Sequence, residues 1–235
     1  MKKELTGKVL IVTGSTGTLG AEMADKLAQV GATVVLCGRN IRKLENVYDR
    51  ILKNVGQKPA IYPIDFLGAT ASDYDALFET VQQEMGPIDG IIHCAAAFDH
   101  LTPLEQISPD QWAQCIHVNL TVPFLMTQAI RPFLMRSRRA ISVFIGDDAV
   151  GDGKAFWGAY GVAKRGLQTL ANTLQEEQDP TIFGVEFFIP GPMQSRIRLK
   201  AFPSENRDRL VPAEVVAETL KQKIVHMFNS KQDLG

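Results

Sequence analysis

The chain has no strong charge bias, no long apolar run and only three cysteines. Its 25 basic and 26 acidic side chains leave a net charge of −1, which argues against nucleic acid as a partner. No apolar run approaches the ~20 residues of a membrane-spanning helix, so we expect no membrane partner. The first residues are basic but lack the apolar core of a signal peptide, and Cys37, Cys94 and Cys115 are odd in number and widely spaced. These absences favour a cytoplasmic protein with reduced thiols and no metal site.

The chain also lacks a linker. No stretch rich in Pro, Gly or Ser and no break in composition divides its 235 residues, and its apolar content of 45% is ordinary for a globular protein. We therefore predict one domain over residues 1–235, with a polar tail at 229–235.

What the chain does have is an alternation of apolar and amphipathic stretches. Short apolar runs predict strands at 8–13, 33–37, 60–64, 90–94, 141–145 and 183–189. Helical patterns fall at about 19–30, 42–54, 72–85, 108–137 and 159–178, and from residue 212 onward. The alternation predicts an α/β fold, a Rossmann-like doubly wound parallel sheet with helices on both faces. Six strands in the order 3-2-1-4-5-6 are expected.

Two helix starts and one bent helix are predicted from local signals. Ser72 and Asp75 have the spacing of a capping box, and Ser108 precedes a proline at the first helical position. The helix over 108–137 should bend at Pro123 and Pro132.

A glycine-rich turn follows the first strand and opens a helix. In that context backbone N–H groups attract an anion, and glycines allow the pyrophosphate of a dinucleotide to come close. The predicted contacts are Gly14, Ser15, Thr16, Gly17, Thr18, Leu19 and Gly20.

The residues that follow the later strands indicate which dinucleotide the chain binds. Arg39, with no acid beside it, follows the second strand, where an arginine suits the 2′-phosphate of NADP, so NADP is favoured over NAD. Asp65, followed by Phe66, accepts a hydrogen bond from the adenine or caps a turn. Ala95 and Ala96 leave room for a cofactor beyond the fourth strand.

Tyr160 and Lys164 lie four residues apart, which places them on one face of a helix. A cation beside a phenol favours the phenolate, so the pair predicts proton transfer near neutral pH. A tyrosine packed beside a solvated lysine is the alternative. His93, mid-strand between apolar neighbours, is expected to be a core residue.

Taken in order, these features resemble the short-chain dehydrogenase/reductase family. The resemblance runs from about Leu5 to Glu218 and includes Asn119 and Pro190-Gly191. It implies NAD(P)-dependent hydride transfer between NADPH and a carbonyl or alcohol substrate, with Tyr160 as proton donor. Lys164 would bind the nicotinamide ribose and depress the tyrosine pKa, and Asn119 would hold a water of a proton relay. The nicotinamide would lie against Pro190, Gly191, Met193 and Ser195.

The chain departs from that family at its serine, which should lie thirteen residues before the tyrosine. Asp147 stands there, and no Ser or Thr occurs between Val143 and Ala159. An ionised carboxylate only accepts hydrogen bonds and opposes a developing oxyanion. Three hypotheses stay open: a protonated Asp147 that donates, a substrate that offers a hydroxyl or amine, or an Asp147 turned to solvent or Lys154. The last would leave a nucleotide-binding protein with little redox turnover.

Two further departures concern Thr18 and the C-terminus. Compact members of the family usually have glycine where Thr18 stands. The resulting spacing of the glycines resembles that of the sugar-nucleotide-modifying branch of the family. Members of that branch carry a substrate domain, which this chain is too short to hold. No seventh strand is predicted, so we expect a homodimer or homotetramer, with the dimer favoured. The expected pocket walls are Phe98, Leu101, Phe156, Trp157 and Met193, with His100 and Arg196 near the mouth.

Overall fold

The computed structural model describes residues 3–229, and its centre is a six-stranded sheet. The strand order is β3-β2-β1-β4-β5-β6 and every neighbouring pair is parallel, which confirms the predicted fold. The strands are β1 (Val9–Thr13), β2 (Thr33–Gly38), β3 (Ala60–Pro63), β4 (Gly90–His93), β5 (Ala140–Ile145) and β6 (Phe183–Phe188). Beyond Asn229, the predicted polar tail lies outside the described residues.

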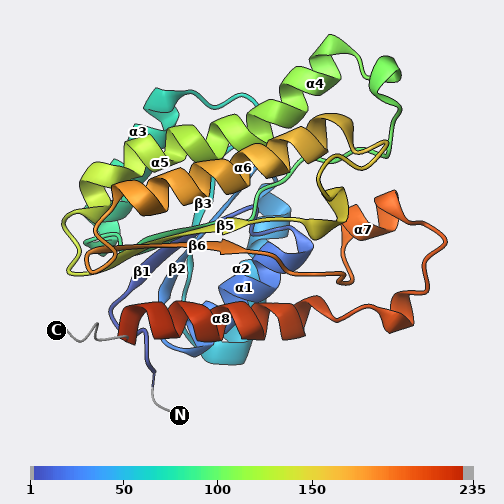
Figure 1. Ribbon diagram of the computed structural model, residues 1–235. Coiled ribbons are helices and arrows are strands. Elements are labelled where there is room, and N and C mark those ends of the chain that lie inside the picture. Colours follow the sequence, from blue (N-terminus) through green and yellow to red (C-terminus); the bar gives the residue numbers. More distant parts are fainter. Residues whose placement is uncertain (1–2, 230–235) are drawn as a thin grey trace, which may run out of the picture.

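Helices cover both faces of this sheet (Figure 1). One layer holds α1 (Thr18–Gln29), α2 (Ile41–Val55) and α8 (Ala213–Asn229). The other holds α3 (Ala71–Met85), α5 (Val122–Leu134) and α6 (Gly158–Glu177). No helix within 3–229 is long and apolar enough to cross a membrane.

The two layers of core follow from the period of two along each strand. Leu10 and Val12 of β1 face the core under α1 and α8, whereas Val9 and Ile11 face the core under α3 and α5. Because both faces are buried, the strands read as nearly continuous apolar runs. That is why the sequence predicted them well.

The start of α3 differs from the prediction by two residues. The N-cap is Thr70, and its backbone N–H donates to Asp73 Oδ2 at 2.7 Å in a capping box. The predicted pair, Ser72 and Asp75, was wrong because Ser72 already lies inside the first turn. Two overlapping pairs share the same spacing here, and only the backbone geometry separates them.

The long helix expected over 108–137 is interrupted. It divides into α4 (Pro109–Ile116), a π-helical segment (His117–Thr121) and α5. Ser108 does cap α4, accepting from Gln111 N–H at 3.2 Å. Pro123 is in the first turn of α5, directly after this π-helical segment, and Pro132 is inside α5, so the bends expected there stay predictions. The interruption itself falls on the segment that carries Asn119.

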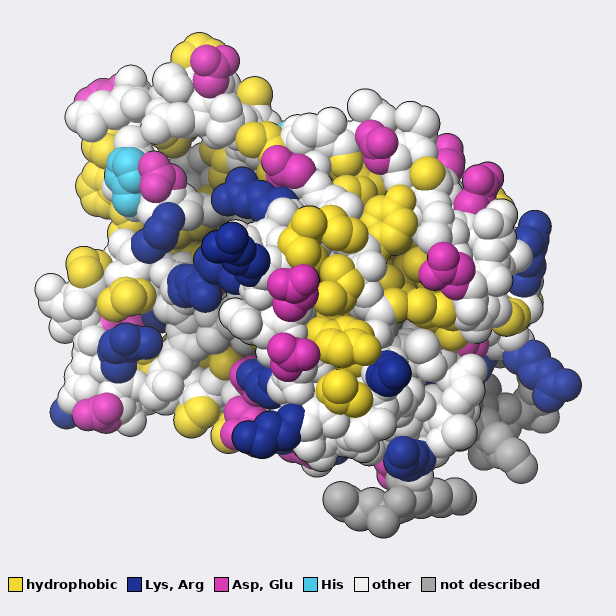
Figure 2. Space-filling view, turned by 180° about the vertical axis from the view of Figure 1, so that it is seen from behind, with side chains coloured by type: hydrophobic (Ala, Val, Ile, Leu, Met, Phe, Trp, Pro, Cys, Tyr) yellow, Lys and Arg dark blue, Asp and Glu magenta, His cyan; other side chains and the backbone are white. Residues whose placement is uncertain are grey.

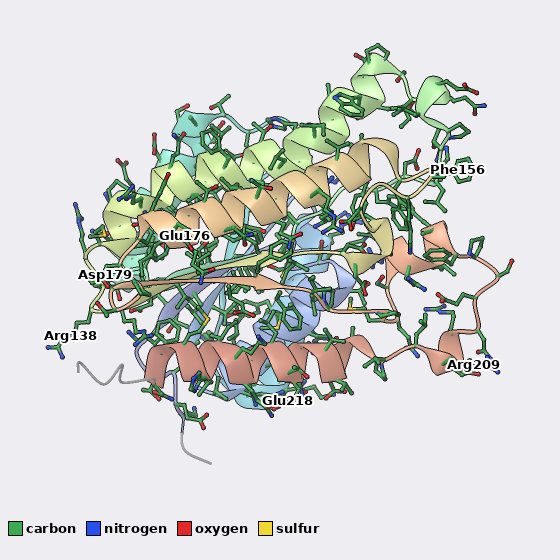
Figure 3. The ribbon with its side chains drawn as sticks, viewed as in Figure 1. Arg138, Phe156, Glu176, Asp179, Arg209 and Glu218 are labelled. Atoms are coloured by element: carbon green, nitrogen blue, oxygen red, sulfur yellow. The ribbon has the colours of Figure 1, made fainter. Side chains whose placement is uncertain are left out.

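The carboxyl ends of the strands define one end of the molecule. Figure 3 shows Phe156 and Arg209 at this end, and Arg138 and Asp179 at the opposite end. The short helix α7 (Arg196–Ala201) follows β6 on the same side as Phe156. Doubly wound sheets bind ligands at this end.

Candidate functional site

The loops at the carboxyl ends of the strands enclose a cavity of about 760 Å³. Figure 2 shows the hollow from behind, with Lys and Arg side chains beside it. The cavity runs from the glycine turn to the Tyr160 end of α6. Among the predicted cofactor and catalytic residues, it is lined by Gly14, Thr16, Gly17, Thr18, Leu19, Gly20, Arg39, Asp65, Phe66, Ala95, Ala96, Asp147, Tyr160, Lys164, Pro190, Gly191, Met193 and Ser195.

The glycine turn leaves room for a phosphate because larger side chains do not fit. Gly14 has φ +62°, and a Cβ there would lie 2.7 Å from the backbone of Ala95. A Cβ on Gly20 would lie 2.4 Å from the carbonyl oxygen of Gly14. Helix α1 starts after Gly17 with no side-chain cap and no acid in its first turn. Its free N–H groups and positive dipole end therefore fit a dinucleotide pyrophosphate.

Ser15 points away from this cavity. Its hydroxyl is buried, donates to the carbonyl of Val12 at 2.6 Å and accepts from the Cys37 N–H at 3.0 Å. The side chain therefore ties β1 to β2, and the backbone N–H of Ser15 also donates to the Cys37 carbonyl, at 3.1 Å, so Ser15 does not line the cavity.

The adenosine end is basic. Arg39 is exposed after β2, and Lys43 in the first turn of α2 lines the cavity beside it. Asn40 caps that helix, accepting from Lys43 N–H at 3.0 Å. Asp65 accepts from Leu67 N–H at 3.2 Å, so it caps a turn while lining the cavity. Lys43 was not predicted as a cofactor contact, although its position three residues after an N-cap asparagine could have indicated one.

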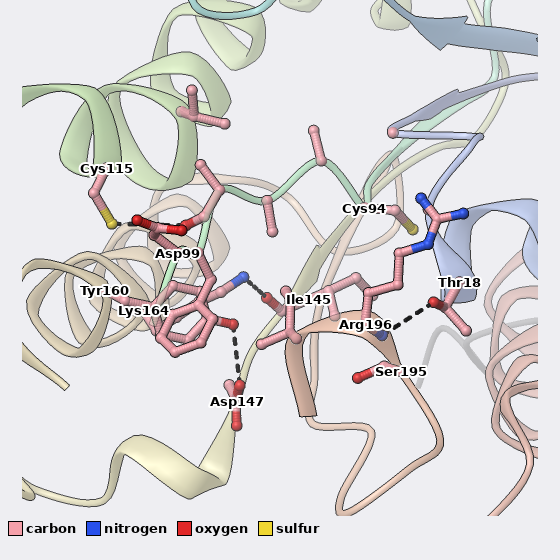
Figure 4. A pocket seen from close by; sticks show the side chains of 18 of the residues that line it. Thr18, Cys94, Asp99, Cys115, Ile145, Asp147, Tyr160, Lys164, Ser195 and Arg196 are labelled. Atoms are coloured by element: carbon pink, nitrogen blue, oxygen red, sulfur yellow. Dashed lines mark hydrogen bonds between the residues drawn. The ribbon is translucent and has the colours of Figure 1, made fainter. Parts of the chain in front are cut away.

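The other end of the cavity holds the tyrosine, the lysine and the aspartate (Figure 4). The Tyr160 hydroxyl donates to Asp147 Oδ2 at 3.0 Å. Asp147 Oδ1 accepts from the Ala149 N–H at 2.9 Å. The hypothesis that Asp147 turns to solvent or to Lys154 is therefore wrong.

Lys164 is buried under the same cavity. Its Nζ donates to the carbonyl oxygen of Ile145 at 2.8 Å and lies 5.6 Å from the centre of the Tyr160 ring. Burial lowers the pKa of Lys164 to about 8, against the raising influence of Asp147. An ammonium has three N–H donors, so two remain for a ligand.

The pKa of Tyr160 moves in the direction opposite to the one predicted. Burial, followed by the negative charge of Asp147, holds the phenol pKa well above its usual value. The expectation that Lys164 depresses it was wrong for this cavity, because a carboxylate accepts directly from the hydroxyl while the ammonium bonds elsewhere. The phenol is thus kept protonated.

Asn119 lies behind the cavity and does not line it. Its amide nitrogen donates to the carbonyls of Ala97 and Cys115 at 2.7 and 2.8 Å, and its oxygen accepts from the Ala97 N–H. The side chain therefore fixes the loop after β4 against the π-helical segment. His93 nearby is a core residue, as predicted: it stacks on Phe144, and burial lowers its pKa to about 3.

Aromatic side chains line the cavity beside Tyr160. The ring centres of Phe98 and Trp157 lie 5.1 and 5.7 Å from that of Tyr160. Phe156 is exposed at the mouth and has φ +73°, a strained value for a bulky residue. Among the predicted walls, Leu101 does not line the cavity but packs behind it.

Helix α7 and the residue before it form one side of the cavity. Ser195 caps it, accepting from Arg198 N–H at 3.0 Å. The Thr18 hydroxyl accepts from Arg196 N–H at 3.4 Å, which joins the glycine turn to α7 (Figure 4). His100 and Arg196 line the cavity, as does Arg198, which no motif in the sequence singled out. Within 3–229, no group of three or more His, Cys, Asp or Glu is placed to hold a metal.

Comparison with known proteins agrees with this geometry. The model of the short chain dehydrogenase family matches residues 8–206. The chain is 30% identical over 213 residues to the uncharacterized oxidoreductase YciK of Escherichia coli K12, covering 90% of this chain and 84% of that protein.

Two solved structures of similar proteins hold a nucleotide. A short chain dehydrogenase from Shigella flexneri, complexed with NADP, has a TM-score of 0.88 at 28% identity and covers 92% of both chains. One from Escherichia coli CFT073, complexed with NADPH, has a TM-score of 0.89 at 28% identity and covers 98% of this chain and 94% of that one. With the family model matched over most of its length, the chain belongs to the short-chain dehydrogenase family.

Proposed function

We propose that the protein is an NADPH-dependent oxidoreductase that reduces a polar double bond, such as the C=O bond of a carbonyl substrate. The observation that carries the proposal is the single cavity that joins the glycine turn to Tyr160 and Lys164. Bound NADPH would supply the hydride. The NADP and NADPH complexes of similar proteins support this choice of cofactor.

The chain's own residues would bind the cofactor along the length of the cavity. The N–H groups at the start of α1 suit the pyrophosphate, and Arg39 with Lys43 suits a 2′-phosphate. The two free donors of Lys164 suit ribose hydroxyls, and Met193 and Ser195 suit the nicotinamide end.

Tyr160 would hold the proton that a reduced carbonyl oxygen needs. Its pKa is raised, so the phenol stays protonated across the physiological range and carries a proton to donate. Asp147, which we take to replace the family's serine, accepts that same hydroxyl. A carbonyl substrate would have to draw the phenol away from the carboxylate.

The first test is nucleotide affinity. We expect Arg39→Ala and Lys43→Ala each to weaken NADPH binding roughly tenfold, since a hydrogen bond to a charged group contributes about 1.5–3 kcal/mol. NADH binding, measured by the same fluorescence titration, should not change. Arg42→Ala is the matched control, because Arg42 is exposed on the same helix and does not line the cavity. Equal wild-type affinities for NADPH and NADH would contradict the choice of cofactor.

The second candidate is a nucleotide-binding protein with little redox turnover. The hydrogen bond from Tyr160 to Asp147 favours it, because that bond occupies the proton donor. The tests separate the two: the second candidate binds NADPH with the same dependence on Arg39 but does not consume it with any substrate.

A further inference from the structure

The substrate end of the cavity carries a carboxylate without a paired cation. Asp147 is half-buried and makes no ion pair within 4.0 Å in the part of the chain that the structure describes. Its carboxylate accepts hydrogen bonds from the neutral Tyr160 hydroxyl and from the backbone N–H of Ala149. A half-buried charge without a partner cation favours a ligand that brings the opposite charge.

The cations closest to Asp147 are engaged elsewhere. The pKa of Arg198 is raised by its hydrogen bonds to Glu205 and, to a smaller extent, by the negative charge of Asp147. Its guanidinium makes two hydrogen bonds of 2.6 Å to Glu205. Lys164 donates to the Ile145 carbonyl at 2.8 Å and makes no ion pair with Asp147 within 4.0 Å, although the negative charge of Asp147 opposes the lowering of its pKa by burial. Arg196 lies toward Thr18, away from Asp147 (Figure 4). Asp148, beside Asp147, is exposed and does not line the cavity.

The aromatic wall is a second, independent feature that favours a cation. Phe98 and Trp157 are in mutual contact, with ring centres 5.5 Å apart, and both line the cavity together with Tyr160. Aromatic faces attract cations that lie within about 6 Å, and they stack on planar groups. The lining of this end of the cavity thus offers a planar cation both a carboxylate and aromatic rings.

We propose, on the basis of the NADPH-dependent function above, that the double bond reduced here is a protonated C=N, an iminium, rather than a carbonyl. The iminium N–H donates to Asp147, and the aromatic wall stacks on the planar cation.

The reaction balances without a proton donor. The iminium carbon gains a hydride from NADPH, the π pair of the C=N bond moves to nitrogen, and a neutral amine and NADP⁺ remain. No oxyanion forms, so the reaction does not need the hydroxyl donor that a serine in place of Asp147 would supply. The Tyr160 hydroxyl keeps its bond to Asp147 and holds the carboxylate in place.

The test compares matched substrates and matched ligands. NADPH oxidation is followed with 3,4-dihydroisoquinoline, which is an iminium when protonated, and with 1-tetralone, a ketone of the same ring system. We expect kcat/KM for the imine to exceed that for the ketone by about 10²-fold or more, the scale of one missing oxyanion donor. In Asp147→Asn, which keeps an oxygen for the Ala149 N–H, the imine rate should fall at least tenfold. Asp148→Asn is the control and should change neither rate.

A binding arm decides the substrate class without turnover. The cation 2-methylisoquinolinium and its neutral isostere 2-methylnaphthalene are titrated into the NADPH complex. Tenfold tighter binding of the cation, lost in Asp147→Asn and kept in Asp148→Asn, supports the inference. Equal affinities, or a cation preference that does not depend on Asp147, would overturn it.

Failure of the function itself has a different signature. Absence of NADPH binding in the parallel titration refutes both the proposed function and this inference. Binding of NADPH without oxidation by either substrate refutes the reductase function alone, while the ratio of cation to neutral affinity still decides what the cavity recognises. Preference for the ketone in the wild type refutes the inference and leaves the reductase function standing.

Discussion

Replacing Gly20 with alanine should weaken nucleotide binding at least ~100-fold while leaving a folded protein. The new Cβ would lie 3.3 Å from the Cys94 Cβ, which is a tight contact, and 2.4 Å from the Gly14 carbonyl oxygen, about 1 Å closer than a normal contact. Either the glycine turn or α1 must move outward by that distance.

The expected magnitudes follow from this displacement. Overpacking of a fitted site costs about 1–3 kcal/mol, from which the gain of ~0.5–1 kcal/mol for alanine over glycine in a helix is subtracted. We expect a net loss of roughly 1–2 kcal/mol of unfolding free energy. Because the helix N–H groups must meet the pyrophosphate at hydrogen-bond distance, NADPH affinity should fall at least ~100-fold, the equivalent of two lost bonds to a charged group.

The assay is a paired measurement of urea unfolding and NADPH titration. Gly68→Ala is the matched control: no atom lies within 4 Å of the Cβ built there and its φ is not positive, so neither quantity should change. A Gly20→Ala protein that binds NADPH as the wild type does would refute the placement of the pyrophosphate against this turn.

Three other predictions concern ionisable groups. Asp147→Ser should raise ketone reduction by ~10²–10³-fold, because it exchanges an opposing carboxylate for a hydroxyl donor; a variant no faster than the wild type would contradict this. The pKa of Lys164 is lowered in the fold to about 8, so the unfolded chain binds more protons above pH 8 and this lysine adds stability as pH rises. Urea unfolding at pH 8 and 9 should show the wild type gaining relative to Lys164→Met, and an unchanged difference would count against the buried ammonium. The pKa of His93 is lowered to about 3, so the unfolded chain again binds the extra proton, and stability is lost as pH falls below about 6.5. His93→Phe should lose less stability than the wild type between pH 6.5 and 5; equal losses would place the acid sensitivity elsewhere.

The fold was predictable because a parallel sheet buried on both faces leaves continuous apolar runs in the sequence. The glycine turn likewise encodes its own geometry, since positions such as Gly14 and Gly20 have no room for a Cβ. Local signals were weaker where two readings share one spacing, as at the start of α3, where Thr70 rather than Ser72 caps the helix.

The chemistry of the site was less predictable, because it depends on contacts between distant residues. Proximity of Tyr160 and Lys164 on one helix face is a matter of spacing, but the sign of the tyrosine pKa shift depends on burial and on which group bonds the hydroxyl. Neither is contained in the spacing. The interruption at Asn119 depends in the same way on bonds to a loop more than twenty residues earlier.

The most direct test of the account follows the hydride itself. The wild-type protein is incubated with NADPH that carries deuterium at the transferable position of C4, together with a panel of ketones, aldehydes and cyclic imines, and the products are analysed by mass spectrometry. The account predicts deuterium on the former double-bond carbon of at least one product, with the imine labelled fastest. Tight NADPH binding with no deuterium in any product would contradict it and would favour a protein that binds the nucleotide without using it.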